Sequence, residues 1–487
     1  MTWLKRIQDL EQYLNPVLVK EVRQALRSKR FRGSFGFTVM AGLIVAISVL
    51  LANASSAAIR PVGGIFFVGT FSCLAVAVLS FVPLNTFNSM GAEFEENTFD
   101  MLVISRLKPR QIILGKLLAS GALALMHFSA FGFFIVFAFL FGGIDPTVVF
   151  FSLPALAVLA LTASSLALCL SSLSQKRMVR VTLTLLLAAI CLGLVFGTIG
   201  FVMATTERGI DLTGDDELQA IVFALVAAIT VTSLSLGVGA SRLAHPEENR
   251  STSLRVGGFV AAMLVLGWGV WAFQVFGQVE LLFMAGVISA MVTALVGSFF
   301  ATERETLGRR VSNTLPRSMA LRALALPWLP GGARGFLWVV MTFGAIDAVY
   351  AIATANHVMA ARFGGTVPRF GIALASVLAY LVIYTQLFAG LFPNWKSRPK
   401  RMLLNRAMAP ILLILGIVVP NIYGFLIQNQ ELAEGLHLGN PFWSLLKIVS
   451  DEKDPTLLFL AAGVVLVLQL FRVMPAIKEV MSAPRTP

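Results

Sequence analysis

The sequence contains twelve apolar stretches, most of about 20 residues or more, and this feature limits the possible folds more than any other. A stretch of that length crosses a bilayer as an α-helix, which satisfies its own backbone hydrogen bonds where water is absent. A porin-type barrel would show shorter segments that alternate in polarity. The sequence therefore predicts an all-α polytopic membrane protein. The predicted spans are residues 34–53, 63–89, 110–142, 147–174, 178–203, 218–242, 256–276, 280–300, 335–355, 369–392, 407–428 and 456–473.

The overall composition supports this class. Hydrophobic residues make up 57% of the chain and charged residues 13%, whereas soluble domains carry about 25% charged residues. An ordinary soluble enzyme and a disordered chain are therefore excluded. The cysteines Cys73, Cys169 and Cys191 lie in apolar stretches without disulfide or metal-ligand spacing. We expect them to be small packing residues, and we expect no metal site.

The positive charge follows the predicted topology. With the N-terminus in the cytoplasm, 32 of the 38 Lys and Arg residues lie in or beside inner loops. This distribution matches the positive-inside rule and places both termini in the cytoplasm. It accounts for the net charge of +13 without a nucleic-acid partner. The short outer loops, without a disulfide framework, favour a bacterial plasma (inner) membrane.

The polar N-terminal region, residues 1–33, predicts an amphipathic helix on the inner membrane surface. Asn15 and Pro16 are typical of a helix start. An apolar stripe runs through Val19, Val22 and Leu26. Basic side chains follow on one side at Lys20, Arg23, Arg27 and Arg30. We expect that side to contact lipid phosphates; the alternative is a solvated charge cluster that sets the topology.

The inner loop at residues 91–110 combines acids with an amphipathic pattern. Its acids are Glu93, Glu95, Glu96 and Asp100. Apolar residues recur at helical spacing through Leu102, and Pro109 can begin the next helix. These features predict a short cytoplasmic helix with exposed acids, on which a soluble partner would dock and move two spans together. The alternative is a surface turn that packs on its own bundle.

This loop resembles the intracellular coupling segment of type-2 ATP-binding-cassette (ABC) exporter permeases. The resemblance rests on Glu93, Glu95, Thr98, Asp100, Pro109, Ile112, Gly115 and Lys116. Residues 15–27 also resemble the connecting helix that opens such permeases. The chain departs from the family pattern at Glu96 and Asn97, where a basic residue and a glycine are usual. From the resemblance together with the acids and the amphipathic pattern of the loop, we expect these coupling residues: Glu93, Glu95, Glu96, Thr98, Asp100, Leu102, Pro109 and Lys116.

The resemblance covers about half of the chain and implies three parts. Residues 1–33 would form the connecting helix, residues 34–245 a six-span permease-like half, and residues 246–487 six further spans. The run from Glu303 to Thr306 echoes the first loop, which suggests a degenerate second half. A true repeat would permit a pseudo-dimeric monomer. Six accessory spans would instead require a homodimer.

The chain lacks the glycine-rich phosphate loop of an ATPase. We therefore expect no enzyme activity and no cofactor in this chain. The resemblance implies that a separate ABC ATPase subunit docks on the inner face and carries ATP and Mg²⁺. The cargo expected of such an exporter is amphiphilic or lipid-linked.

Two polar residues within the predicted spans, Asp347 and His127, are candidates for function. Asp347 is an intramembrane acid, a feature that is costly and often functional; Thr342, Tyr350 or Thr354 could instead satisfy it structurally. His127 is interpreted as a packed histidine. Asp347 supports a second hypothesis, a proton-coupled secondary transporter with twelve spans. A third hypothesis is a membrane scaffold that anchors partners without transport.

Overall fold

The protein is described by a computed structural model, and over the described residues every regular element is helical. The described residues are 15–54, 62–95, 109–173, 177–209, 215–243, 249–301, 303, 307–312, 315–316, 318–355, 366–391, 415–416, 418–419, 440, 444, 447–448 and 454–482. The chain divides into two compact units, residues 1–244 and 245–487.

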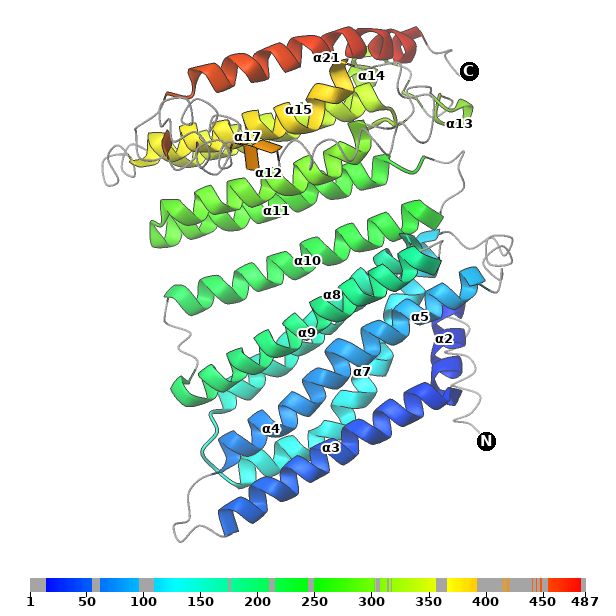
Figure 1. Ribbon diagram of the computed structural model, residues 1–487, viewed down its shortest axis with the longest axis vertical. Coiled ribbons are helices and arrows are strands. Elements are labelled where there is room, and N and C mark those ends of the chain that lie inside the picture. Colours follow the sequence, from blue (N-terminus) through cyan, green and yellow to red (C-terminus); the bar gives the residue numbers. More distant parts are fainter. Residues whose placement is uncertain are drawn as a thin grey trace. The chain divides into compact units, whose positions relative to one another are not determined.

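The first unit begins with a short helix that lies across the ends of longer ones (Figure 1). Its elements are α2 (Pro16–Arg27), α3 (Lys29–Ala54), α4 (Gly63–Val76), η1 (Ala77–Phe81), α5 (Val82–Glu95), α7 (Pro109–Leu140), α8 (Pro146–Leu173), α9 (Arg177–Arg208) and α10 (Asp215–Leu243). The segments α4, η1 and α5 follow one another without a break, so the second span is one helix with a π-helical turn. Such turns shift the register of the side chains on either side.

The second unit contains five long helices and three short ones among its described residues. They are α11 (Thr252–Phe276), α12 (Val279–Ala301), α13 (Arg309–Ser312), α14 (Met319–Ala325), η2 (Leu326–Trp328), α15 (Gly332–Thr354), α17 (Thr366–Leu391) and α21 (Thr456–Ser482). The short helices α14 and η2 precede α15 and contact α21 and α15, respectively.

Eleven helices in the described part of the chain are long and apolar enough to cross a membrane. They coincide with eleven predicted spans, and the expected all-α polytopic class is confirmed at that level. The predicted span 407–428 lies almost wholly outside the described residues. The last span was predicted to end at residue 473, but α21 continues to Ser482. Its extension is held because Val480 packs in a buried cluster with Leu326 and Leu329.

The core of the first unit is built from aromatic and small side chains. Phe66 and Phe67 of α4 pack with Phe131 and Phe134 of α7. On α8, a face of small side chains is buried: Ala163, Ser164, Ser165, Ala167, Cys169, Ser171 and Ser172. Small residues let helix backbones approach closely in membranes, and α8 packs against both α5 and α10.

Two adjacent serines on α8 test whether a hydrogen bond between helices stabilises this packing. Ser171 Oγ donates to the Phe87 carbonyl of α5 at 2.8 Å, whereas Ser172 Oγ donates to Cys169 of its own helix at 2.6 Å. Both residues are buried. Ser171→Ala should therefore lower the free energy of unfolding by about 0.6 kcal/mol or more, and Ser172→Ala by less. Unfolding in mixed micelles with increasing SDS measures both; an equal effect of the two variants would contradict the assignment.

Candidate functional site

The N-terminal helix α2 begins as the sequence predicts. Asn15 Oδ1 accepts a hydrogen bond from the Val17 N–H at 3.0 Å, and Pro16 occupies the first turn. The Asn15 amide also donates to the Gln111 carbonyl of α7 at 2.7 Å. The cap therefore starts α2 and joins it to the beginning of the third span.

A glycine allows α2 to lie against α7. A Cβ added at Gly115 would stand 2.8 Å from the Val17 Cβ and 3.0 Å from the Asn15 amide nitrogen. Any larger residue would push the two helices apart. Gly115 belongs to the motif that resembles the family, and the structure supplies a local packing reason for it.

A cluster of four charges joins three helices at this position. Lys116 Nζ of α7 lies 2.7 Å from Glu21 Oε1 of α2 and 3.2 Å from Glu93 Oε1 of α5. Lys20 Nζ of α2 lies 3.1 Å from the same Glu93 oxygen. We call these residues, Lys20, Glu21, Glu93 and Lys116, the charge cluster. It contains two cations and two anions, so its formal charges cancel.

The members of the charge cluster differ greatly in burial. The exposed fraction of the side chain is 1% for Lys116 and 8% for Glu93, but 50% for Lys20. Moving an ammonium and a carboxylate out of water costs several kcal/mol each, and only close pairing offsets that cost. The exposed Lys20–Glu93 pair contributes little by comparison. The pairing of Lys116 with the carboxylates of Glu21 and Glu93 is therefore the part of the cluster that stability depends on.

This arrangement corrects the expectation of exposed acids at the start of the loop. The helix α5 continues through Glu95, so Glu93 lies in its last turn, and its carboxylate is buried against Lys116. The physical reason is that Lys116 enters the bundle about two turns into α7 and needs an anion there. Glu93 is therefore an internal contact of the bundle and not an exposed docking group.

The expectation that the basic side of α2 contacts lipid phosphates is also corrected in part. Lys20 pairs with Glu93, and the helix ends at Arg27, so Arg30 belongs to α3. The change of direction occurs at Ser28, whose N–H and hydroxyl both donate to the Ala25 carbonyl. Arg23 and Arg27 are exposed on α2, so a contact with lipid phosphates stays a prediction for these two.

The other predicted coupling residues divide into two groups. Pro109 is the first residue of α7, as predicted, and the backbone of Glu95 ends α5. Glu96, Thr98, Asp100 and Leu102 lie outside the described residues. Their helix and their docking role stay predictions.

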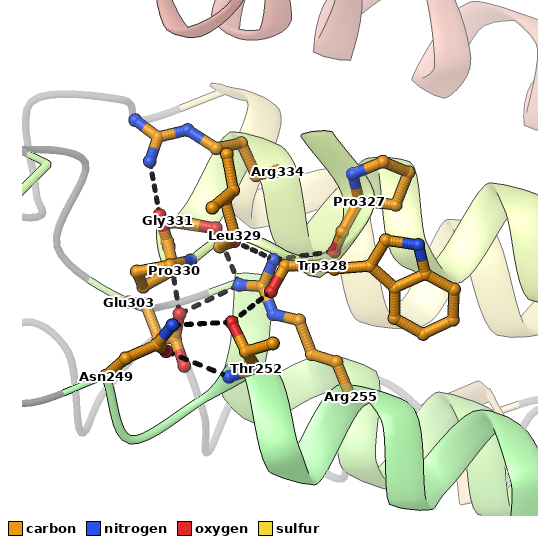
Figure 2. A network of polar contacts seen from close by, with 10 residues as sticks. All are labelled: Asn249, Thr252, Arg255, Glu303, Pro327, Trp328, Leu329, Pro330, Gly331 and Arg334. Carbon is orange, nitrogen blue, oxygen red and sulfur yellow. Dashed lines mark hydrogen bonds and ion pairs between the residues drawn. The ribbon is translucent and has the colours of Figure 1, made fainter. Parts of the chain in front are cut away.

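In the second unit, a buried arginine organises the segment between α12 and α15 (Figure 2). The exposed fraction of the Arg255 side chain is 0%, and its guanidinium lies 2.8 Å from Glu303 Oε2. It also donates to the carbonyls of Pro327, Leu329 and Gly331. The turn before α15 is therefore folded around one side chain at the start of α11.

Glu303, which begins the run that resembles the first loop, has a structural role in the second unit. Glu303 accepts from Arg255 and from the Gly331 N–H, at 2.8 and 3.0 Å. Arg334, at the start of α15, pairs instead with Glu479 of α21 at 2.7 Å. Both units thus place a paired acid at or just after the end of their second membrane span and a paired base near the start of their third. Sequence reasoning did not single out Arg255 or Glu479; an arginine in the first turn of a span was the available signal.

The two polar candidates within spans, Asp347 and His127, have different surroundings. Asp347 is half-buried on α15 and makes no hydrogen bond or ion pair with any residue that the structure describes. Thr342 and Thr354, its suggested partners, donate to the carbonyls of Trp338 and Tyr350 in their own helix. His127 is 1% exposed, as expected of a packed residue. Its ring lies edge-on to Phe31 and Phe35 of α3.

The chain was compared with known proteins. No family model, no curated protein and no solved structure matches it.

Lys20 and Lys116 provide a matched test of the charge cluster, because both contact the same Glu93 oxygen at nearly equal distances. Lys116→Met leaves two carboxylates facing each other in the bundle and should lower the free energy of unfolding by about 3–5 kcal/mol. Lys20→Met should lower it by less than about 1 kcal/mol. Adding Glu21→Gln and Glu93→Gln to Lys116→Met should restore part of the loss. Similar values for the two single variants would rule out a central role for Lys116.

Proposed function

We propose that this chain is the membrane-spanning permease subunit of an ABC exporter of the type-2 class, driven by a separate ATPase subunit. One observation carries the proposal: the charge cluster joins α2, the end of α5 and the start of α7. The helices α5 and α7 flank the predicted coupling segment, and α2 is the predicted connecting helix. The spans themselves support a membrane transporter in the broad sense.

The cluster supports force transfer for a simple mechanical reason. A partner that pulls on residues 96–108 pulls on Glu95 at one end and on Pro109 at the other. Glu93 and Lys116 lie within two turns of those ends and hold each other at 3.2 Å. Separating them would leave charges unpaired in a low-dielectric bundle. The inner ends of the second and third spans would therefore move together with α2.

A permease subunit of this class also implies a partner, a cargo, a membrane and an assembly. ATP and Mg²⁺ bind the partner subunit, and this chain provides the path for an amphiphilic or lipid-linked cargo. The membrane is a bacterial inner membrane with both termini in the cytoplasm. The complex contains either two copies of this chain or one copy with two permease-like units.

Charge reversal in the predicted coupling segment tests partner docking. Glu96→Lys/Asp100→Lys should abolish co-purification of an ABC ATPase in mild detergent, because the partner would lose its acidic contacts. The matched control is Glu207→Lys/Glu280→Lys, which reverses two exposed acids at predicted outer ends of spans and should retain the partner. An ATPase assay of the protein purified from the coupling-segment variant and from the control variant measures how much partner each retains. If folded wild-type protein brings down no ATPase, the proposal fails.

A second candidate function, proton-coupled transport, has one observation in its favour. Asp347 is an acid on a membrane-spanning helix without a partner among the described residues, and such acids often carry protons. Asp347→Asn should then abolish cargo uptake driven by a proton gradient in proteoliposomes, with Thr354→Val as a control. Transport that needs ATP and survives Asp347→Asn would exclude this candidate. A scaffold would bind its partner but move no cargo in either assay.

A further inference from the structure

Two cavities adjoin each other in the first unit, on the side of the charge cluster that faces α3. The larger has a volume of about 400 Å³, within the range of small-ligand sites. The smaller has a volume of about 170 Å³. Both are lined by Asn85, Asn88 and Leu123, so they form two parts of one region. The larger part reaches Glu21 and Lys116, and the smaller part reaches His127.

The hydroxyl groups that line the cavities present oxygens as acceptors. Thr86 donates its hydrogen to the Val82 carbonyl at 2.9 Å, and Ser120 donates to Leu117 at 2.7 Å. Ser34 and Ser89 bond in the same way to carbonyls of their own helices. A hydroxyl has one hydrogen, so each oxygen keeps acceptor capacity only. These hydroxyl oxygens therefore call for hydrogen-bond donors on whatever fills the cavities.

His127 adds an acceptor in the smaller cavity. Its Nδ1 lies 2.9 Å from the Leu123 carbonyl, which can only accept, so Nδ1 carries the hydrogen. In the neutral ring, Nε2 is then an acceptor. This atom is buried and has no hydrogen-bond partner among the residues that the structure describes. A buried polar atom of this kind costs free energy unless a donor reaches it.

The two asparagines supply donors as well as acceptors. Asn85 is half-buried and Asn88 is exposed, and neither makes a hydrogen bond to a described residue. Both lie in the second membrane span, Gly63–Glu93. Polar side chains within spans are costly and line cavities or functional paths. Each carboxamide can donate two hydrogen bonds and accept others.

This pattern of donors and acceptors selects one class of head group. A phosphate or carboxylate only accepts, so it would leave His127 Nε2 and the hydroxyl oxygens unsatisfied. An ammonium only donates, so it would leave the amide hydrogens of Asn85 and Asn88 unsatisfied. A hydroxyl group does both without carrying a charge, whereas a zwitterionic head group does both only by bringing two full charges into the cavity. Glu21 and Glu93 already neutralise Lys116. The other cation of the lining, Lys29, is exposed, so the buried part of the site lacks a strong demand for a charged ligand.

The apolar part of the lining indicates that this head group is attached to a lipid. Phe31, Phe81 and Val82 line the smaller cavity with His127. On α3, beside this region, large apolar side chains such as Phe37 and Met40 are exposed, as expected of a lipid-facing span. An amphiphile in the inner leaflet could therefore place its chains in the bilayer and its head group between α3, α5 and α7.

The geometry points to a binding site for the neutral, hydroxyl-rich head group of a lipid, with Asn85, Asn88 and His127 as its specificity-determining residues. This inference goes beyond the proposed function and does not require it, because binding needs neither ATP nor an ATPase subunit. Lipid binding can fail while the permease function holds, and the permease function can fail while lipid binding holds. The site also adjoins Glu21 and Lys116 of the charge cluster, so an occupant would lie against the helices proposed to move.

Direct binding tests the site. The full chain is purified in a polyoxyethylene detergent, because maltoside detergents carry the sugar chemistry in question. Tritiated monoglucosyl dioleoylglycerol is the probe, and the competitors are dioleoylglycerol, phosphatidic acid, phosphatidylethanolamine and free glucose. We expect saturable binding of the probe without displacement by equal concentrations of any competitor. Displacement by phosphatidic acid or phosphatidylethanolamine would overturn the head-group class, and displacement by glucose would overturn the lipid source.

Variants assign the binding to these residues. Asn85→Leu/Asn88→Leu should weaken binding about tenfold or more, since each lost hydrogen bond is worth about 1 kcal/mol. His127→Phe keeps a ring against Phe31 and Phe35 and should weaken binding several-fold. The control is Gln274→Leu, an exposed carboxamide on α11, which should bind as wild type. Unchanged binding by the asparagine variant would overturn the site.

A measurement on the wild-type chain covers the case in which a variant does not fold. A photoreactive glucosyl lipid should cross-link to peptides from α5 and α7, and unlabelled glucosyl lipid should suppress the cross-link. Cross-links spread over other spans without such suppression would contradict the proposal.

Discussion

The ammonium group of Lys116 is the constraint on which the inner end of the first unit depends. It is almost completely buried, and a charge in that environment is tolerated only beside opposite charges. Glu21 and Glu93 come from two other helices, so satisfying one side chain brings α2, α5 and α7 together. Gly115, the neighbouring residue, allows α2 the close approach that this pairing needs. The position of the N-terminal helix is therefore a consequence of electrostatics and of close packing.

The second unit meets a related problem with a different solution. Arg255 is as buried as Lys116, but three backbone carbonyls and one carboxylate surround it. A guanidinium has five donors in a planar arrangement, so it can organise a turn, whereas an ammonium is a compact point charge. The turn at residues 327–331 is folded around Arg255 as a result (Figure 2). The first unit thus joins three helices around an ammonium group, whereas the second folds a turn around a guanidinium.

The charge cluster and the polar cavities occupy the same neighbourhood. Glu21 and Lys116 line the larger cavity and also hold α2 on the bundle. A ligand in that cavity would contact groups whose pairing fixes three helices. In the proposed transporter this juxtaposition would link occupancy of a lipid site to the elements that receive force from the ATPase. The volume of the larger cavity and the pairing of Glu21 with Lys116 both depend on the distance between α2 and α7.

The sequence by itself determined the fold class, the bounds of most spans and the start of α2. These features depend on local properties: the length of an apolar run, the helix-capping ability of Asn15 and the restricted backbone of Pro16. The tertiary structure decided which charged groups are exposed and which are internal. Glu93 was expected at the surface because it stands in an acidic run, yet it is buried because Lys116, more than twenty residues later, enters the bundle beside it. The Arg255 turn and the cavity at His127 likewise depend on contacts between residues far apart in the chain, which local patterns do not encode.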